Sequence, residues 1–221
     1  QDSLSALNPV YTIGIKLMET IRLHYSMTKA EARNRALELL KAVGINEPEN
    51  CMRCYPHQLS GGMRQRVLIA MAVSSSPKLL IADEPTTALD VTIQIQILRL
   101  LRDIQARTGM SIIFITHDLG VVAQICSRIA VMCGGHIVEE GTAEEIFYQP
   151  FHPYTRALID SITKKGADFT PYLERSSEQK EEDGLCPFLK RCGCCTESCK
   201  SALPDRYRMS DSHSLLCWKR G

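Results

Sequence analysis

Two adjacent acids, Asp83 and Glu84, close a short apolar run at residues 78–83, and a second apolar run at residues 111–116 leads into His117. One carboxylate of such a pair can hold Mg²⁺ while the other orients or deprotonates a water, and a nearby histidine can contact the phosphoryl group under attack. The plainer alternative is that acids at strand ends only cap the next turn. The residue types favour attack of water on phosphorus, provided that the fold brings them together.

A serine and two glycines, Ser60, Gly61 and Gly62, precede a predicted helix at residues 63–74. The first turn of a helix exposes backbone N–H groups at its positive end, and glycine has no Cβ to hold a phosphate away, so the pattern is typical of an anion site. The alternative is an ordinary helix cap with a loop glycine. The sequence contains no G-x-x-x-x-G-K-[ST] stretch, the loop that usually cradles nucleotide phosphates.

The elements that must position these residues alternate from residue 78 onward. The succession strand, helix, strand, helix, strand predicts a parallel α/β sheet, and the nearly all-apolar strands indicate burial on both faces. The carboxyl ends of its strands would then bring Glu84 and His117 to one edge. The expected elements are helices at 28–43, 91–108, 119–126, 143–148 and 154–162, strands at 78–83 and 111–116, and a hairpin at 128–133 and 136–140.

Composition and charge exclude several classes of protein. The 221 residues are 44% hydrophobic and 23% charged, as in an ordinary globular protein, and the formal net charge of +1 argues against a nucleic-acid partner. No apolar run approaches the roughly 18 residues that a membrane span needs. The sequence opens on Gln1 with neither an initiator Met nor a signal peptide, so we expect a piece of a longer protein.

Cysteines gather near the C-terminus, where five of the ten lie within 14 positions. Nothing in the sequence directs the chain to an oxidising compartment, so metal binding is favoured over disulfides. Four thiolates suit an iron–sulfur cluster or a tetrahedral zinc, and free thiols are the third alternative. Cys194 and Cys195 could each replace a neighbouring ligand. The candidate ligands are Cys186, Cys192, Cys199 and Cys217.

Four stretches resemble the ATPase subunit of an ABC transporter. "LSGGMRQRV" at 59–67 resembles the signature motif of that family, and "LLIADEPTTALD" at 79–90 resembles its Walker B segment and D-loop. "ITHD" at 115–118 resembles the switch histidine, and "QDSLSALNP" at 1–9 resembles the Q-loop. "FHPYTRALI" at 151–159, followed by "CPFLKRC", resembles the peptide and nickel importer branch, whose C-terminal cysteine motif is associated with a [4Fe–4S] cluster.

The resemblance implies a role for each residue of the proposed reaction. Gln1 would contact Mg²⁺ and the attacking water, and Asp83 would hold Mg²⁺ through water. Glu84 would be the general base, and His117 would clamp the γ-phosphate of ATP. Ser60, Gly61 and Gly62 would bind the γ-phosphate of ATP held by a partner subunit. Asp90 would communicate across the dimer.

The resemblance also implies a fold class and a domain division. The fold would be an α/β ABC-type nucleotide-binding domain that lacks its N-terminal strands, with the phosphate loop upstream of Gln1. A partial ATPase domain would span 1–163. It would contain a helical subdomain at 5–57, which docks on the permease, and a catalytic core part at 58–142. A linker at 164–184 and a small Cys-rich module at 185–221 would follow.

The implied function is ATP hydrolysis that energises import of peptides, nickel or another small solute, at the cytoplasmic face of the cell membrane. Partners would be a second ATPase subunit in a heterodimer, two permease subunits and, indirectly, an extracytoplasmic binding protein. Two alternatives remain. One is a truncated, non-catalytic subunit that lends its signature segment to a partner, and the other is an ABC-type ATPase of DNA repair or translation. We expect the 221 residues alone to be inactive, because the phosphate-cradling loop that grips the nucleotide is missing, and poorly soluble, because apolar edges would be exposed.

Overall fold

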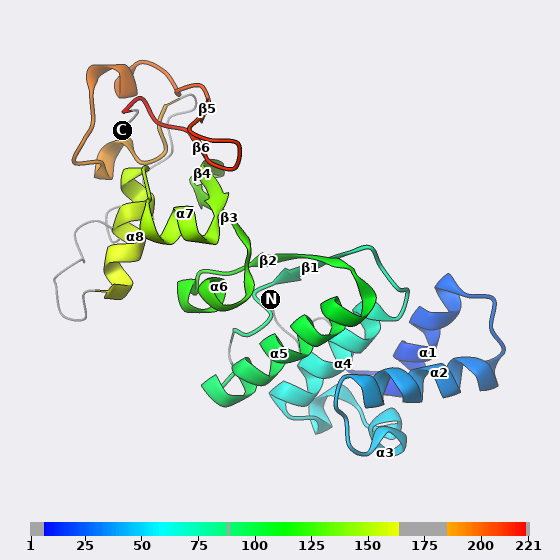
Figure 1. Cartoon of the computed structure of the whole chain (residues 1–221). Helices are drawn as coiled ribbons and strands as arrows, with labels where there is room; N and C mark the ends of the chain where they lie inside the picture. The colour runs from blue at the N-terminus through cyan, green and yellow to red at the C-terminus, as the bar shows by residue number, and fades with distance from the viewer. Residues whose placement is uncertain (1–6, 88, 164–184, 220–221) are drawn as a thin grey trace. The chain divides into compact units, whose positions relative to one another are not determined.

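The computed structural model describes residues 7–87, 89–163 and 185–219 (Figure 1). The chain divides into two compact units, residues 1–117 and 118–221, which are considered separately. Gln1 and the predicted linker at 164–184 lie outside the described residues. No helix in the described ranges combines the length and the apolar character that crossing a membrane requires.

The first unit begins with a group of helices around a small apolar core. The predicted capping box opens α2, because the Glu31 N–H donates to Thr28 Oγ1 at 3.3 Å and the Thr28 N–H donates to Glu31 Oε2 at 2.8 Å. The helix is stopped by Gly44, whose φ of 80° is left-handed. The elements are α1 (Ile13–His24), α2 (Lys29–Ala42), α3 (Pro48–Arg53), η1 (Pro56–Gln58) and α4 (Gly61–Val73). Leu17, Ile21, Ala32, Ala36 and Leu40 are fully buried between them.

Two parallel strands complete this unit. β1 (Leu79–Asp83) and β2 (Ser111–Ile115) pair in register, with Asp83 opposite Ile115, and α5 (Val91–Thr108) makes the crossover between them. In Figure 1, α4 and α5 lie beneath these strands. The predicted helix α5 buries an apolar stripe that includes Ile97, Leu101 and Ile104. The predicted strand–helix–strand order is therefore confirmed, and both strands end at the same edge.

Burial of these strands on both faces was expected, but within the described residues only one face is covered. Leu80 and Ala82 are buried, but Leu79 and Ile81 are 47% and 62% exposed. On β2, Ile113 and Ile115 are 48% and 47% exposed. The strands alternate between a covered and an uncovered face, and the uncovered face is apolar.

The second unit is built on an antiparallel sheet. α6 (Leu119–Ile125) precedes β3 (Arg128–Cys133) and β4 (His136–Thr142), which form the predicted hairpin around Gly134 and Gly135 with φ of 50° and 73°. Positive φ at both turn positions is what a tight two-residue hairpin requires. The third strand was expected to extend the parallel sheet. In the described chain, β3 instead pairs antiparallel with β4, in a sheet of order β3-β4-β6-β5.

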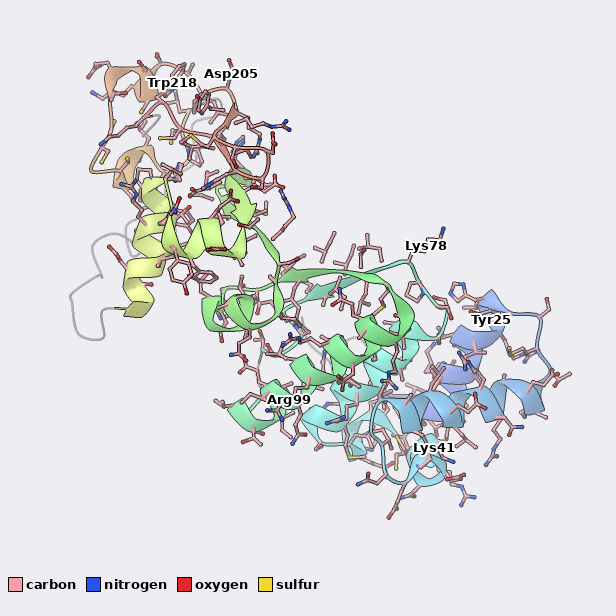
Figure 2. The ribbon with its side chains drawn as sticks, in the orientation of Figure 1. Tyr25, Lys41, Lys78, Arg99, Asp205 and Trp218 are labelled. Carbon is pink, nitrogen blue, oxygen red and sulfur yellow. The ribbon has the colours of Figure 1, made fainter. Side chains whose placement is uncertain are left out.

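The C-terminal residues share this sheet and its core. β6 (Ser214–Leu215) pairs with β4 and with β5 (Tyr207–Arg208), and Phe188 is 2% exposed in the core cluster beneath the hairpin. Trp218, labelled in Figure 2, donates its indole N–H to the Ala202 carbonyl at 3.1 Å. The remaining elements are α7 (Ala143–Tyr148), α8 (Pro153–Thr163), η2 (Leu189–Arg191) and η3 (Glu197–Lys200).

Candidate functional site

The ends of the two parallel strands bring Glu84 and His117 into contact. The Glu84 N–H donates to the Ile115 carbonyl at 2.9 Å, so the strand pairing continues one residue beyond β1. Glu84 Oε1 then lies 2.8 Å from His117 Nδ1. A carboxylate can only accept, so Nδ1 carries the hydrogen of this bond. Two residues that are 33 positions apart in the sequence thus form one polar pair.

A tight turn holds the other oxygen of the same carboxylate. Glu84 has a left-handed φ of 47°, and the Thr87 N–H donates to the Glu84 carbonyl at 3.2 Å. The Thr87 hydroxyl donates to Glu84 Oε2. This hydrogen bond, followed by that from His117, lowers the pKa of the Glu84 carboxyl. The carboxylate is therefore ionised and oriented, as a base that accepts a proton from water must be.

The exposure of the pair suits a phosphate that arrives from outside the chain. The His117 side chain is 80% exposed, whereas that of Glu84 is 16% exposed. An imidazolium ring can donate from both nitrogens, so His117 has the chemistry to bind Glu84 through Nδ1 and a phosphate oxygen through Nε2. The roles of Glu84 as a base and of His117 as a phosphate contact stay predictions.

Asp83 is the residue of this edge that is suited to Mg²⁺. It ends β1 and is exposed. Mg²⁺ usually keeps several waters and binds through one or two carboxylates together with substrate phosphates. Among the described residues there is no group of three or more His, Cys, Asp or Glu side chains that could hold a metal ion by itself. Asp83 fits a Mg²⁺ ion whose other ligands are nucleotide oxygens and water. The predicted second protein ligand, Gln1, lies outside the described residues.

The signature segment forms the start of α4, as predicted. The Ser60 side chain caps the helix by accepting the Met63 N–H at 3.3 Å. Gly61 and Gly62 occupy the first two helical positions, where backbone N–H groups have no partner within the helix. A Cβ on Gly62 would lie 2.8 Å from Ile93 Cγ2. Sequence reasoning gave these glycines one role, access for phosphate, and missed that Gly62 also allows α4 to pack against α5.

The predicted communication residue, Asp90, caps the neighbouring helix. Asp90 Oδ1 accepts the Ile93 N–H at 2.9 Å at the start of α5. One residue earlier, Leu89 lies against Gly61, since a Cβ on that glycine would be 3.3 Å from Leu89 Cδ2. The segment that follows β1 therefore contacts His117 through Glu84 at its start, and it contacts the signature helix α4 through Leu89 near its end.

The second unit gathers cysteines around a cavity, here called the cysteine cavity. It is lined by the four predicted ligands together with Cys194, Cys195 and His152; the predicted ligands are Cys186, Cys192, Cys199 and Cys217. Each of these thiols is free. Burial, together with the neighbouring thiols, raises the pKa of Cys186 to about 11. Thiols this close resist ionisation together unless a cation compensates their charge.

A buried carboxylate beside this cavity escaped the sequence analysis. Glu139 on β4 is 0% exposed. It accepts the backbone N–H groups of Phe151 at 2.7 Å and His152 at 3.1 Å, and His213 Nε2 at 2.8 Å. The adjacent acids Glu139 and Glu140 in an otherwise apolar hairpin were the available signal, because alternation along a strand turns one of two neighbours inward.

Two family models match the chain. The model described as ABC transporter matches residues 4–87, and the model described as oligopeptide/dipeptide transporter, C-terminal region, matches residues 138–199. The first match contains the signature segment and Glu84. The second contains Glu139, His152 and three of the four predicted cysteine ligands.

Curated relatives are similar over nearly the whole chain. The dipeptide transport ATP-binding protein DppD of Bacillus subtilis is 48% identical over 99% of this chain and 66% of its own length. The oligopeptide transport ATP-binding protein OppD of the same organism is 54% identical, over 99% and 62%. A probable peptide ABC transporter ATP-binding protein of Sinorhizobium fredii is 44% identical, over 99% and 67%. The chain spans about two thirds of the length of these relatives.

Solved structures share the fold. A dimeric ATP-binding cassette in a post-hydrolysis state with ADP and Pi superposes with a TM-score of 0.55 at 33% identity, covering 62% of this chain and 59% of that one. CbiO1 of Clostridium perfringens, part of the ABC transporter complex CbiONQ, superposes with a TM-score of 0.58 at 28% identity, covering 73% and 61%.

Proposed function

The chain belongs to the ABC transporter family as an ATP-binding protein of the oligopeptide/dipeptide type, and on that premise we propose that it hydrolyses ATP to energise the import of peptides. The observation that carries this proposal is the Glu84–His117 pair at the ends of two parallel strands. The names of the relatives favour this function over a non-catalytic subunit. Nickel or another small solute is the alternative cargo.

In the proposed reaction, Glu84 accepts a proton from the water that attacks the γ-phosphate. Its carboxylate is already ionised and held at both oxygens, so no reorganisation is needed at the moment of attack. His117 contacts the γ-phosphate through its outer nitrogen. Mg²⁺, held by Asp83 through water and by Gln1, would neutralise charge on the phosphate oxygens.

The signature segment serves a second nucleotide in this proposal. Ser60, Gly61 and Gly62 bind the γ-phosphate of ATP that is held by a homologous partner subunit in a heterodimer, and Asp90 lies at the contact between the subunits. The support is the start of α4, with its unpaired N–H groups. The similar solved cassette is a dimer with ADP and Pi.

The remaining partners are membrane subunits. We propose that the helical residues 5–57 dock on two permease subunits at the cytoplasmic face of the membrane, with an extracytoplasmic binding protein delivering peptide. The support is a set of large apolar side chains exposed at and before α1, at Val10 (72%), Tyr11 (45%), Ile15 (49%) and Leu23 (78%). Exposed apolar side chains mark interaction surfaces where they gather into a contiguous patch.

The phosphate-cradling loop and the first strands of the ATPase domain are assigned to sequence N-terminal to these 221 residues. The support is the uncovered apolar face at Leu79, Ile81, Ile113 and Ile115, which further elements of the domain would cover. The proposed division keeps a partial ATPase domain at 1–163, a linker at 164–184 and a Cys-rich module at 185–221.

The cysteine cavity is proposed to hold a [4Fe–4S] cluster through Cys186, Cys192, Cys199 and Cys217, with zinc as the alternative. All four thiols line one cavity. Four thiolates are the ligand set of a [4Fe–4S] cluster or of a tetrahedral zinc. Such a cluster supplies one-electron chemistry when bound. Iron and sulfide analysis with a visible spectrum tests the assignment, and zinc at one per chain without sulfide would contradict it.

The transport function is tested on the complete protein assembled with its permease subunits in vesicles. Labelled dipeptides, oligopeptides and Ni²⁺ are offered in parallel with ATP. We expect peptide uptake and ATP hydrolysis to be lost together in Glu84→Gln. ATP hydrolysis that Glu84→Gln leaves intact would contradict the proposed base, and uptake of Ni²⁺ alone would contradict the proposed cargo.

A further inference from the structure

Arg66 of the signature helix α4 joins that helix to two others. α4 packs against both α2 and α5 (Figure 1). The Arg66 guanidinium donates to the Val43 carbonyl at the end of α2, at 2.6 Å, and to Gln96 Oε1 on α5, at 3.0 Å. The planar fork of arginine holds its N–H groups in fixed directions, so one side chain can bind two acceptors at once. Arg66 therefore ties three helices together.

The end of α2 has room for this guanidinium and an acceptor for it. Val43 is 1% exposed, and carbonyls at the end of a helix lack an N–H partner within it. The negative end of the helix dipole also favours a cation at this place. Gly44 follows, and a Cβ at that position would lie 2.7 Å from Arg66 Nη1. Gly44 therefore ends α2 and also leaves space for Arg66.

The first turns of α4 are held differently from the rest of the helix. Gly62 precedes Arg66 by four residues, so the two lie on the same face, one turn apart. Gly62 fits against Ile93 of α5, and Gln96 lies three residues beyond Ile93 on that helix. The fully buried residues of α4 all come after Arg66; they are Val67, Ile69 and Ala70. Arg66 thus stands between the apolar part of α4 and its signature turn.

α2 belongs to the helical part that the proposed function places against the permease. α1 and α2 pack on each other, and Leu17, Ile21 and Leu40 are fully buried. Close-packed interiors have low compressibility, so a displacement of α1 is passed on to α2. The hydrogen bond from Arg66 to Val43 continues this link from the end of α2 to α4.

We propose that Arg66 is a positioning residue that transmits displacement of α1 and α2 to the signature segment, so that stimulation of ATP hydrolysis by peptide depends on its bonds to Val43 and Gln96. This inference rests on the proposed transport function. With both bonds in place, a movement of α2 shifts the start of α4 relative to the ATP that the partner subunit holds. Without them, α2 can move while the start of α4 stays in place.

The test uses the complete protein, assembled with its permease subunits in vesicles. ATP hydrolysis is measured with peptide-free and with dipeptide-loaded binding protein, and the ratio of the two rates is the stimulation. Arg66→Gln should lower the stimulation by about 3–10-fold, within the range for residues that lie between coupled sites. Arg66→Lys keeps the charge without the planar fork, so its stimulation should lie between those of Arg66→Gln and wild type. The control is Arg107→Gln, an exposed arginine that donates to the Asp103 carbonyl of its own helix at 3.1 Å, and it should leave the stimulation unchanged.

A second variant separates transmission from a structural role. Gln96→Ala removes the acceptor on α5 and should also lower the stimulation. Because Arg66→Gln and Gln96→Ala break the same hydrogen bond, the double variant should lose less than the product of the two single effects. A role in stability alone would lower both rates in equal proportion and leave their ratio unchanged.

The outcomes separate this inference from the proposed function. A wild-type complex that peptide stimulates, with the same ratio in Arg66→Gln, overturns the inference and leaves the transport function standing. A wild-type complex that hydrolyses no ATP overturns both, and hydrolysis that peptide does not stimulate overturns the inference. If Arg66→Gln does not fold, Arg66→Lys and Gln96→Ala decide. A lower ratio in these variants supports the inference, and an unchanged ratio in both overturns it.

Discussion

The Thr87 hydroxyl donates a hydrogen bond to the Glu84 carboxylate across the turn that follows β1. His117 binds the other oxygen of the same carboxylate, at 2.8 Å. Thr87 of the turn and His117, two residues beyond the end of β2, thus each bind one of the two oxygens. The orientation of the proposed base is fixed by these two donors before any nucleotide is present.

Replacing the proposed base should abolish turnover without abolishing binding. In the assembled transporter, we expect Glu84→Gln to lower kcat for ATP by about 10²–10⁴-fold, the usual contribution of a general base. The amide still accepts a hydrogen bond, so ATP affinity should be retained. Steady-state hydrolysis and nucleotide binding measure the two effects. The control is Glu144→Gln, which removes an exposed acid of α7, and a comparable loss in that variant would contradict a specific role for Glu84.

The pH dependence of hydrolysis should respond to Thr87. The hydrogen bond from Thr87 is the largest cause that lowers the pKa of Glu84. Glu84 serves as a base above its pKa and fails as pH falls through it. Thr87→Val removes the hydroxyl, which raises the pKa and moves the acid limb of the kcat–pH profile to higher pH. Thr87→Ser keeps the donor and should leave the limb in place. Identical profiles for Val and wild type would count against the contact.

A methyl group on the second signature glycine should destabilise the first unit. The Cβ of Gly62→Ala would lie 2.8 Å from Ile93 Cγ2, and overpacking of this kind costs about 1–3 kcal/mol. The free energy of unfolding, measured in urea, checks the cost. Ile93→Ala removes the clashing atom, so the double variant should recover part of the loss relative to the sum of the single changes. Strict additivity would show that the clash is not the cause.

Loss of the buried carboxylate should weaken the second unit. Glu139→Ala leaves two backbone N–H groups and His213 without an acceptor, and breaking a buried charged network typically costs about 3–5 kcal/mol. The neighbouring Glu140 makes only partly exposed ion pairs with Arg128 and Arg206, so Glu140→Ala should cost about 0–1 kcal/mol. Urea unfolding of both variants tests the contrast, which would fail if the two costs were equal.

Much of the site could be predicted because its signals are local. The capping box of Thr28 and Glu31 is a pattern of four consecutive residues. The placement of Glu84 beside His117 followed from one rule about parallel strands, and the pairing of Asp83 with Ile115 satisfies it. These features depend on short spacings and on the direction of strands, which a sequence contains.

The remainder depends on partners, which apolar patterns do not specify. The turn at Gly134 and Gly135 predicts that β4 pairs with the strand at 128–133, but this strand is as apolar as those before it, and nothing in its pattern says whether it also joins the parallel sheet. Val131 pairs with Glu139, but the next residue of β3, Met132, pairs with Ile137, so Val138 is an extra residue on β4. Both Val138 and Glu139 are fully buried. Simple alternation would have placed one of them outside. The role of Gly62 likewise depends on Ile93, 31 positions away.

The uncovered face of β1 and β2 makes protein concentration an experimental variable. Leu79, Ile81, Ile113 and Ile115 are exposed on this face, and two copies of such an apolar face can cover each other. Association of this kind is second order, so any melting temperature or sedimentation coefficient of these 221 residues should change on dilution. Each of these quantities should therefore be measured at several concentrations of the isolated chain.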